Sequence, residues 1–453
     1  MTEFTATVLP EIKTKLEHLP NELLLQIMDC LPTSTLKVAV VVCKAIRTIV
    51  EESLYKHVSI APSQLLGSQR SYSTLLFLKT LLARPDLAGI VKSLAMWIED
   101  DRATEDVTTI AGLMIPGSVS VGISYSAAEL AVTVLSILPA VERLQLDVTS
   151  LRSNDTGPLR PAASLFTASH QHEIKLVSTF TNVRSLVWAG PEVSFSLASL
   201  PNLESLTLPK HSMFFRSAEH HEISNITTLS LKTDTRILLP ATQPISNKIQ
   251  YLSVFLEGCL FLKKLVIAIN DVPMFVRTSG HLRAHRGRQG HIDTLIELLA
   301  ESIPALEDLE IVLDQEENNW WLDHIIPVTV LKDLARLKSV KIPQQGLVGG
   351  DQPGTSIVAT SISELLPESL ERLELLYPSE NVFEFFDRLI QERHDCPKLD
   401  QVVIHCATFG RGLPFRQLGD GIGMQKLWET NLVSKQLREV GIETELRGPM
   451  MHA

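Results

Sequence analysis

The chain has 453 residues, with 41 Lys or Arg against 52 Asp or Glu, so its formal net charge is −11. This acidic balance argues against a general nucleic-acid binder, which needs a surplus of cations facing phosphate. The hydrophobic share of 45% and charged share of 21% are typical of a globular protein and exclude wholesale disorder.

The start of the chain has no secretory pattern. Residues 1–15 form a short tail in which Glu3 and Glu11 replace the basic start and apolar block of a signal peptide. No run reaches the roughly 18 apolar residues that a membrane span needs. The five scattered cysteines suit a reducing compartment. We therefore expect a soluble protein of the cytoplasm, the nucleus or both, without a membrane partner.

Residues 16–60 predict three short helices. The first begins near Pro20 and ends before Pro32, and Thr33 or Ser34 caps the second. The third runs from about Cys43 to Lys56. So few residues cannot build a large core, and their spare apolar faces suit docking on a partner. The apolar stripe of the first helix is Leu23, Leu24, Ile27, Met28 and Leu31.

Residues 61–445 repeat one short sequence motif of three apolar residues, in which the second and third follow the first by three and five positions. We call this motif the apolar phrase. Proline precedes several copies, as at Pro139, Pro201, Pro304 and Pro397, and stops a helix before a strand. Each unit then reads as a returning segment followed by a strand, which is the pattern of an irregular leucine-rich-repeat solenoid. A generic α/β protein whose strands share this pattern is the alternative. The copies begin at Val91, Val141, Val183, Leu203, Ile226, Leu262, Leu306, Leu337, Leu370 and Leu399.

A basic insertion at about 272–292 interrupts the repeats, and an acidic stretch follows it. The insertion carries Arg283, Arg286 and Arg288 and suits either a solvated loop or a site for an acidic partner. Trp320 and Trp321, beside the acids, could anchor a partner or be buried between repeats. The last residues, 446–453, form a tail.

The catalytic patterns in the sequence are incomplete. His172-Glu173 and His221-Glu222 each begin a zinc-protease pattern without its second histidine, and no phosphate-binding glycine loop is present. His394, Cys396, His405 and Cys406 lie close in sequence, but they lack the separated pairs of a zinc site. We therefore predict no catalytic residue, metal or cofactor, and assign these four residues structural roles.

The N-terminal module resembles an F-box over about 45 residues. The resemblance is carried by Leu19-Pro20-x-Glu22-Leu23-Leu24-x-x-Ile27, then Leu31-Pro32-x-x-x-Leu36 and Val42-Cys43-Lys44. The segment Leu54–Val58 resembles the one that follows many fungal F-boxes. Ile46 departs from the tryptophan that the family often has there, which predicts weaker adaptor binding.

The resemblance implies a Skp-type adaptor as partner and, through it, a cullin. The residues implied to contact the adaptor, some of which could instead be core, are Leu19, Pro20, Glu22, Leu23, Ile27, Leu31, Pro32, Leu36, Val42, Cys43 and Ile46. The chain would then be a non-catalytic substrate receptor of a Skp–cullin–F-box ubiquitin ligase, its repeats holding an unknown target protein. A repeat scaffold that acts outside any ligase is the alternative.

Overall fold

A computed structural model describes most of the chain in fifteen stretches. These are residues 19–42, 46–60, 70–99, 127–149, 180–190, 192–194, 198–209, 213–215, 224–238, 247–270, 290–313, 325–348, 361–378, 381–405 and 432–447. The chain divides into two compact units, the first comprising 1–97 and 101–144 and the second 98–100 and 145–453. The architecture is mixed α/β, with helices first and parallel strands after them, as the sequence predicts.

The first unit begins with α1 (Asn21–Asp29), α2 (Thr33–Val42) and α3 (Arg47–Lys56). It continues with β1 (His57–Ile60), α4 (Arg70–Ala83), α5 (Pro85–Ala88), β2 (Ser93–Glu99) and α7 (Ala127–Ser136), up to the start of β3 (Arg143–Thr149). β1 pairs in parallel with β2, and Ile60 lies opposite Met96. The third helix ends at Lys56, as the sequence predicts, and Val58 and Ile60 alternate with polar residues in the strand that completes the module.

Strands of the second unit follow one another in chain order within a parallel sheet. They are β4 (Ser185–Trp188), β6 (Ser205–Leu208), β8 (Thr228–Asp234), β9 (Lys264–Asn270), β11 (Asp308–Leu313), β13 (Ser339–Pro343), β14 (Arg372–Leu376), β15 (Gln401–His405) and β16 (Glu443–Arg447). Two short parallel pairs stand beside them: β5 (Glu192–Ser194) with β7 (Met213–Phe215), and β10 (Gly290–His291) with β12 (Ile325–Ile326).

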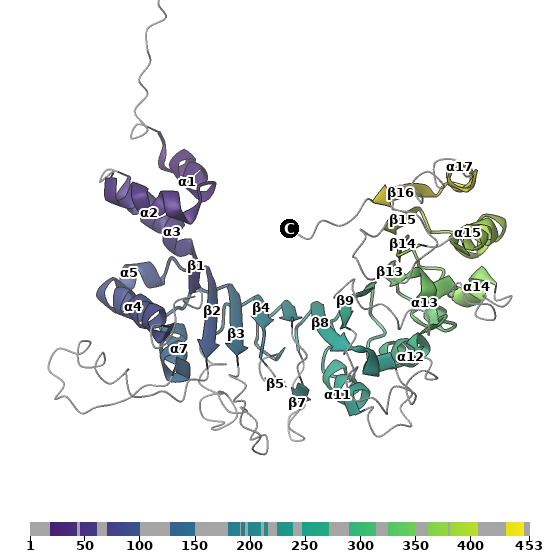
Figure 1. Cartoon of the computed structure of the whole chain (residues 1–453), viewed down its shortest axis with the longest axis horizontal. Coiled ribbons are helices and arrows are strands. Elements are labelled where there is room, and N and C mark those ends of the chain that lie inside the picture. The colour runs from purple at the N-terminus through teal and green to yellow at the C-terminus, as the bar shows by residue number, and fades with distance from the viewer. Residues whose placement is uncertain are drawn as a thin grey trace, which may run out of the picture. The chain divides into compact units, whose positions relative to one another are not determined.

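Helices line one side of these strands (Figure 1). The α-helices are α11 (Asn247–Leu256), α12 (Ile292–Ser302), α13 (Gln344–Val348), α14 (Ile362–Leu365), α15 (Asn381–Gln391) and α17 (Val433–Glu439). Single 3-10 turns are η2 (Thr235–Leu238), η4 (Leu331–Asp333) and η5 (Arg393–Asp395). The core lies between helices and sheet, because α12 buries Leu295 and Leu299 and α15 buries Phe385 and Phe386.

All ten apolar phrases of the sequence coincide with strands or their first turn. In each phrase the three apolar residues are buried, as Leu306, Leu309 and Ile311 are at β11, with at most 1% exposed. Opposite positions such as Asp308 and Glu310 are only half-buried. The phrase therefore marks one inward face per strand, which is why neighbouring copies stack in register.

The turns before the strands stack as regularly as the strands. The backbone N–H of Glu307 donates to Lys263, that of Lys338 to Glu307 and that of Glu371 to Lys338, over 2.7 to 2.8 Å. Their side chains alternate in charge, and Lys338 Nζ lies 2.8 Å from Glu307 Oε2. In the earlier turns, the side-chain amide of Asn225 donates to the Pro201 carbonyl at 2.8 Å. The four stacked positions 263, 307, 338 and 371 form one edge of the sheet, which is called the charged edge below.

Candidate functional site

The helix α1 presents one apolar stripe inward and a second one outward. Leu24 and Met28 are each 2% exposed and lie in the interior, whereas Leu23 and Ile27 are 46% and 39% exposed. Residues three or four apart share a helix face, so Pro20, Leu23 and Ile27 form one continuous outward strip. Pro20 begins it because its fixed φ of −53° fits the residue just before the first helical turn. Large apolar side chains are therefore available here for a partner.

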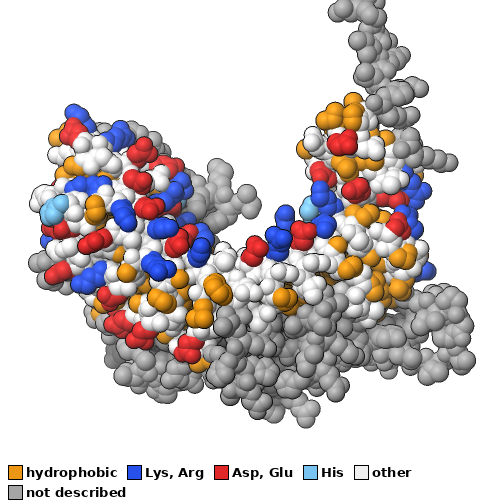
Figure 2. Space-filling model, turned by 180° about the vertical axis from the view of Figure 1, so that it is seen from behind, with side chains coloured by type: hydrophobic (Ala, Val, Ile, Leu, Met, Phe, Trp, Pro, Cys, Tyr) orange, Lys and Arg blue, Asp and Glu red, His pale blue; other side chains and the backbone are white. Residues whose placement is uncertain are grey.

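The helix α2 adds two exposed valines that do not belong to the predicted contact set. Val38 is 61% exposed and Val41 80% exposed, and they are one helical turn apart. The signal for them is the unbroken apolar run from Val38 to Val42, because a helix can bury only one side of such a run in a small module. Figure 2 shows hydrophobic side chains gathered on this module, at the upper right.

Other residues predicted to contact the adaptor lie inside the module. Leu36 is 5% exposed and Ile46 is 4% exposed, and both belong to the cluster formed with Leu24, Met28 and Val50. In this conformation they hold the three helices together and do not reach the surface. Leu19 and Leu31 are partly buried against the same cluster. Glu22 and Pro32 are exposed.

Two residues of the predicted contact set have no described side chain. The backbone of Val42 ends α2, but the placement of its side chain is outside the described part, and Cys43 lies outside it altogether. The predicted partner-binding residues Arg283, Arg286, Arg288, Trp320 and Trp321 also lie outside the described residues. Their roles stay predictions.

Two sets of ion pairs hold the module in shape. Lys56 Nζ at the end of α3 lies 2.7 Å from Asp29 Oδ2 at the end of α1, and this bond lowers the pKa of Asp29 despite partial burial. Glu51 on α3 accepts from Arg47 at 2.8 Å and lies 3.3 Å from Arg84, and these cations lower its pKa against the effect of burial. The helices are therefore fixed by charge as well as by their small core.

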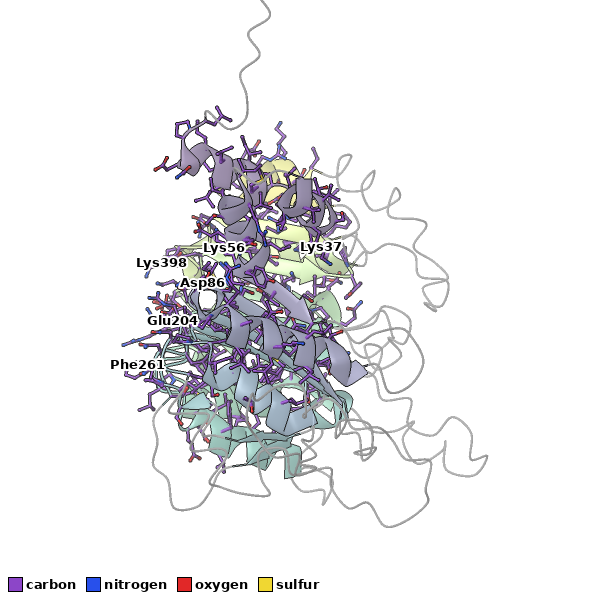
Figure 3. The ribbon with its side chains drawn as sticks, turned by 90° about the vertical axis from the view of Figure 1, so that its left-hand side faces the viewer. Lys37, Lys56, Asp86, Glu204, Phe261 and Lys398 are labelled. Atoms are coloured by element: carbon purple, nitrogen blue, oxygen red, sulfur yellow. The ribbon has the colours of Figure 1, made fainter. Side chains whose placement is uncertain are left out.

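The stick view in Figure 3 labels two lysines of this module. Lys37 on α2 and Lys56 on α3 are labelled in Figure 3 on different parts of the helical module. Lys37 is exposed and immediately precedes Val38 in the chain. A partner that covers Val38 and Val41 would therefore meet a positive charge beside the apolar surface.

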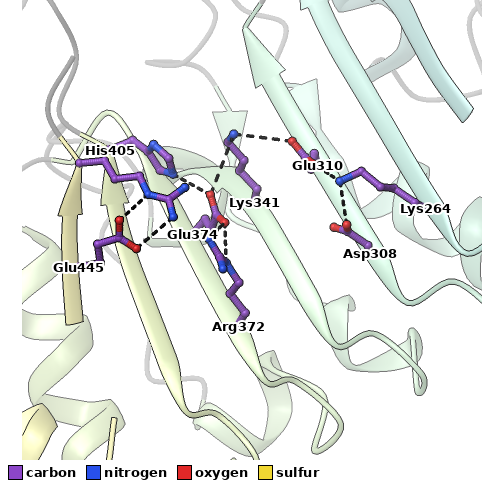
Figure 4. Close-up of polar contacts among 9 residues, drawn as sticks. Lys264, Asp308, Glu310, Lys341, Arg372, Glu374, His405 and Glu445 are labelled. Atoms are coloured by element: carbon purple, nitrogen blue, oxygen red, sulfur yellow. Dashed lines mark hydrogen bonds and ion pairs between the residues drawn. The ribbon is translucent and has the colours of Figure 1, made fainter. Parts of the chain in front are cut away.

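A second group of polar residues crosses the outward face of the sheet from β9 to β14. Figure 4 shows Lys264 between Asp308 and Glu310, and Lys341 between Glu310 and Glu374. Each of these residues alternates along its strand with an inward apolar residue. We call this set the ionic row.

Glu374 is the residue of the ionic row with most partners. Arg372 Nε donates to its Oε1 at 2.6 Å, and Nε2 of His405 lies 2.6 Å from its Oε2. Burial would raise the pKa of Glu374, but the bond from His405 and the charge of Arg372 outweigh it and lower that pKa to about 2. Glu374 is therefore ionised throughout the physiological range.

The four residues considered for a zinc site are not gathered into one. His394 is exposed in η5 and pairs with Asp395, while Cys396 is fully buried and burial raises its pKa to about 11. His405 contacts Glu374 of the ionic row, and Cys406 lies outside the described residues. Within the described stretches, no group of three or more His, Cys, Asp or Glu could hold a metal ion.

None of the helices in the described stretches combines the length and apolar character that crossing a membrane requires.

The helical module matches a known family. A comparison with protein-family models matched residues 16–61 to the F-box-like family. This segment is an F-box-like domain. Such domains are typically non-catalytic adaptor modules, and they imply a Skp-type partner. The match covers about a tenth of the chain, and a search of curated proteins found no match to it.

Proposed function

We propose that this chain is the substrate receptor of a Skp–cullin–F-box ubiquitin ligase. The F-box-like domain would bind the Skp-type adaptor through the outward strip of Pro20, Leu23 and Ile27, joined by Val38 and Val41. The observation that carries this proposal is the exposure of these side chains on a module whose family is an adaptor-binding one. Single exposed apolar side chains are common, but a contiguous group of them on one small module is typical of a protein-binding surface.

The second unit is proposed to hold the target protein. Its apolar phrases, register and turn-to-turn bonds support an irregular leucine-rich-repeat solenoid, in which each strand and returning segment form one unit. The related alternative, an α/β protein with similar strands, has less support because strand order follows chain order from β4 to β16. A bound target would lie near a ubiquitin-conjugating enzyme that already carries ubiquitin, and the ubiquitination rate of the target would rise through proximity.

The experiment is a binding titration of the purified full chain with a Skp-type adaptor. We expect saturable binding, weakened about 100-fold or more by the double change Leu23→Asp and Ile27→Asp, because each buried aliphatic side chain contributes about 1.5–3 kcal/mol. The matched control is Leu82→Asp, which alters a 54%-exposed leucine on α4, outside the three helices. A wild-type chain that does not bind any adaptor tested would contradict the proposal.

Co-purification of a cullin distinguishes a ligase subunit from a scaffold that acts outside a ligase. We expect the cullin with the wild-type chain and its loss in the Leu23→Asp, Ile27→Asp variant. If the adaptor binds in solution but no cullin co-purifies with either the wild-type chain or the variant, the scaffold alternative is favoured.

A further inference from the structure

Most turns that lead into the strands of the second unit share one geometry. The N–H of the first residue of the apolar phrase donates to the carbonyl three residues earlier, as Leu306 donates to Ile303 over 3.1 Å. The two residues between them form the tip of a β-turn, where proline is favoured first and small or polar residues are common. Tips of this kind are Pro201-Asn202, Pro304-Ala305 and Pro397-Lys398.

The turn before β9 departs from this chemistry. Its tip is Leu260-Phe261, although the N–H of Leu262 donates to Cys259 over the same 3.1 Å. Leu260 is 51% exposed and Phe261 is 53% exposed. The other seven phrases of the second unit have no large aliphatic or aromatic residue at these two positions, so the turn does not require one. Figure 3 labels Phe261 at the margin of the second unit, on the same side as Lys398, which holds the equivalent position before β15.

The next turn along the sheet extends the apolar surface. The N–H of Glu307 donates to the Lys263 carbonyl at 2.8 Å, which fixes the register of the two turns. The tip Pro304-Ala305 therefore lies beside the tip Leu260-Phe261, about 4.8 Å away. Pro304 is exposed and Ala305 is half-buried. Apolar side chains that gather in this way are typical of a protein-binding surface. We call these four residues the apolar tips.

A surplus of cations borders the apolar tips on the side of the strands. Lys338 Nζ lies 2.8 Å from Glu307 Oε2. The bond from Lys338, and after it the charges of Lys263 and Arg336, lower the pKa of Glu307 against the effect of burial. Lys263 and Arg336 are exposed, and their side chains form no hydrogen bond or ion pair with the described residues. Three cations thus surround one carboxylate, in a chain whose net charge is −11.

Glu257 and Glu301 border the apolar tips on the side of the helices. Each is exposed and stands six positions before the stacked residue of its turn, at the end of α11 or α12. The charge therefore changes sign across the apolar tips. Glu257 already accepts from Ser253 Oγ at 3.5 Å, whereas Lys263 and Arg336 keep their charges for a partner. The side of the strands therefore offers the stronger contact, and this contact is to an anion.

We propose that the apolar tips, with Lys263 and Arg336, form a docking surface for an acidic segment of another protein, in which a large apolar residue stands next to carboxylates. The apolar residue covers Phe261, and the carboxylates pair with the two cations. The guanidinium of Arg336 suits this role because it can bind a carboxylate through two parallel hydrogen bonds. The surface belongs wholly to the second unit and its test needs no adaptor, so it can fail without affecting the proposed adaptor binding.

The test is methyl NMR of the full chain with ¹³C-labelled leucine methyl groups, titrated with three synthetic peptides. The first has phenylalanine beside two aspartates, the second has phenylalanine beside two lysines, and the third has alanine beside two aspartates. The Leu260 signals are identified by their loss in Leu260→Ala. We expect them to move saturably with the first peptide, and each of the other two peptides to bind about tenfold more weakly. The signals of Leu432, a 68%-exposed leucine of the same unit, should not move.

Two sets of substitutions sharpen this test. Lys263→Glu combined with Arg336→Glu should reverse the preference, so that the lysine peptide binds more tightly than the aspartate peptide. Phe261→Ser introduces the residue type that Ser369 supplies at the equivalent position before β14. The melting temperature should therefore stay unchanged, while the affinity for the first peptide falls about tenfold. The matched control is Leu432→Ser, which should leave that affinity unchanged.

Several results would overturn the docking surface. Equal affinities for the three peptides, or no saturable shift with any of them, would show that the apolar tips do not select an acidic segment. An unchanged preference after the charge reversal would exclude Lys263 and Arg336. A dimer of the wild-type chain in analytical ultracentrifugation that Phe261→Ser dissociates would show that a second copy of this chain covers the apolar tips. The titration of the wild-type chain decides the question even if a variant fails to fold.

Discussion

At Ile46 and Glu374, the surrounding residues determine what the side chain contributes to the protein. Ile46 stands where the F-box family often has tryptophan, a departure that predicts weaker adaptor binding. The residue is 4% exposed and packs with Leu36 and Val50. A smaller side chain there changes the packing of the module, and affects the adaptor only through the helices that carry the exposed strip.

Glu374 predicts a pH dependence of stability. Its pKa of about 2 in the folded chain lies below the ordinary value of 4.5, so ionised Glu374 stabilises the fold fully above about pH 4.5. That contribution is lost as the pH falls from about 4.5 towards 2. We expect Glu374→Gln to lower the free energy of unfolding by about 2–3 kcal/mol at pH 7 and by much less near pH 2.5. Urea denaturation followed by circular dichroism measures both.

The control for this prediction is Glu445→Gln, which removes an exposed carboxylate from the neighbouring strand. Screened surface pairs contribute little, so its stability should follow that of the wild-type chain at each pH. An equal loss of unfolding free energy in both variants at pH 7 would contradict the prediction. It would mean that the overall charge balance of the sheet, and not the buried bonds of Glu374, sets the stability.

Helix α1 shows which part of an element could be predicted from sequence. Its boundaries follow from Pro20 and Pro32, and the structure has α1 at Asn21–Asp29. The division of its apolar residues could not be predicted, because Leu23, Leu24, Ile27 and Met28 fall in one wide stripe. Only the position of α3 decides that Leu24 and Met28 face inward. The alternation of strands gave a clearer pattern, so the inward residues of the sheet were predictable from the repeated phrase.

β16 shows why part of the sheet escaped sequence reasoning. Its inward positions alternate through Ile442, Thr444 and Leu446, without the three-residue step of the other phrases. Gly441 precedes it with a φ of +83°, a conformation that favours glycine. The bond between His405 and Glu374 was equally hidden, because it joins two strands through residues that are 31 positions apart in the chain.

The first two of the three helices of the F-box-like domain predict opposite outcomes for the same kind of substitution. Val41→Asp changes a residue that is 80% exposed, so we expect an unchanged melting temperature and at least tenfold weaker adaptor binding. Leu24→Asp places a charge at a 2%-exposed position and should unfold the module. Differential scanning calorimetry and an adaptor titration separate the two effects. Unchanged adaptor affinity in Val41→Asp would remove α2 from the proposed surface.

At the scale of the whole molecule, the proposed function assigns separate tasks to residues of the two units. The exposed apolar strip belongs to the first unit, whereas the ionic row and the strands from β4 to β16 belong to the second. A receptor needs both at once, because a target is modified only while the ligase is attached.

This separation predicts a dominant-negative variant. We expect the full chain with Leu23→Asp and Ile27→Asp, produced in cells, to lose the cullin but still retain its target, which should then degrade more slowly. Pulse–chase measurement of proteins that co-purify with this variant, compared with Leu82→Asp, tests the prediction. Target half-lives that are the same for both variants would contradict it.

The charged edge has a consequence for how this protein could lengthen or shorten during evolution. Lys263, Glu307, Lys338 and Glu371 alternate in sign from one stacked turn to the next. Deleting the single unit around β11 would bring Lys263 against Lys338, and duplicating it would bring Glu307 against its copy. Units lost or gained in pairs would meet no such repulsion. The turns that follow stack Glu371, Asp400 and Glu443 in succession, so like charges are tolerated farther along this edge, and the preference for even steps is a small one confined to residues 263–371.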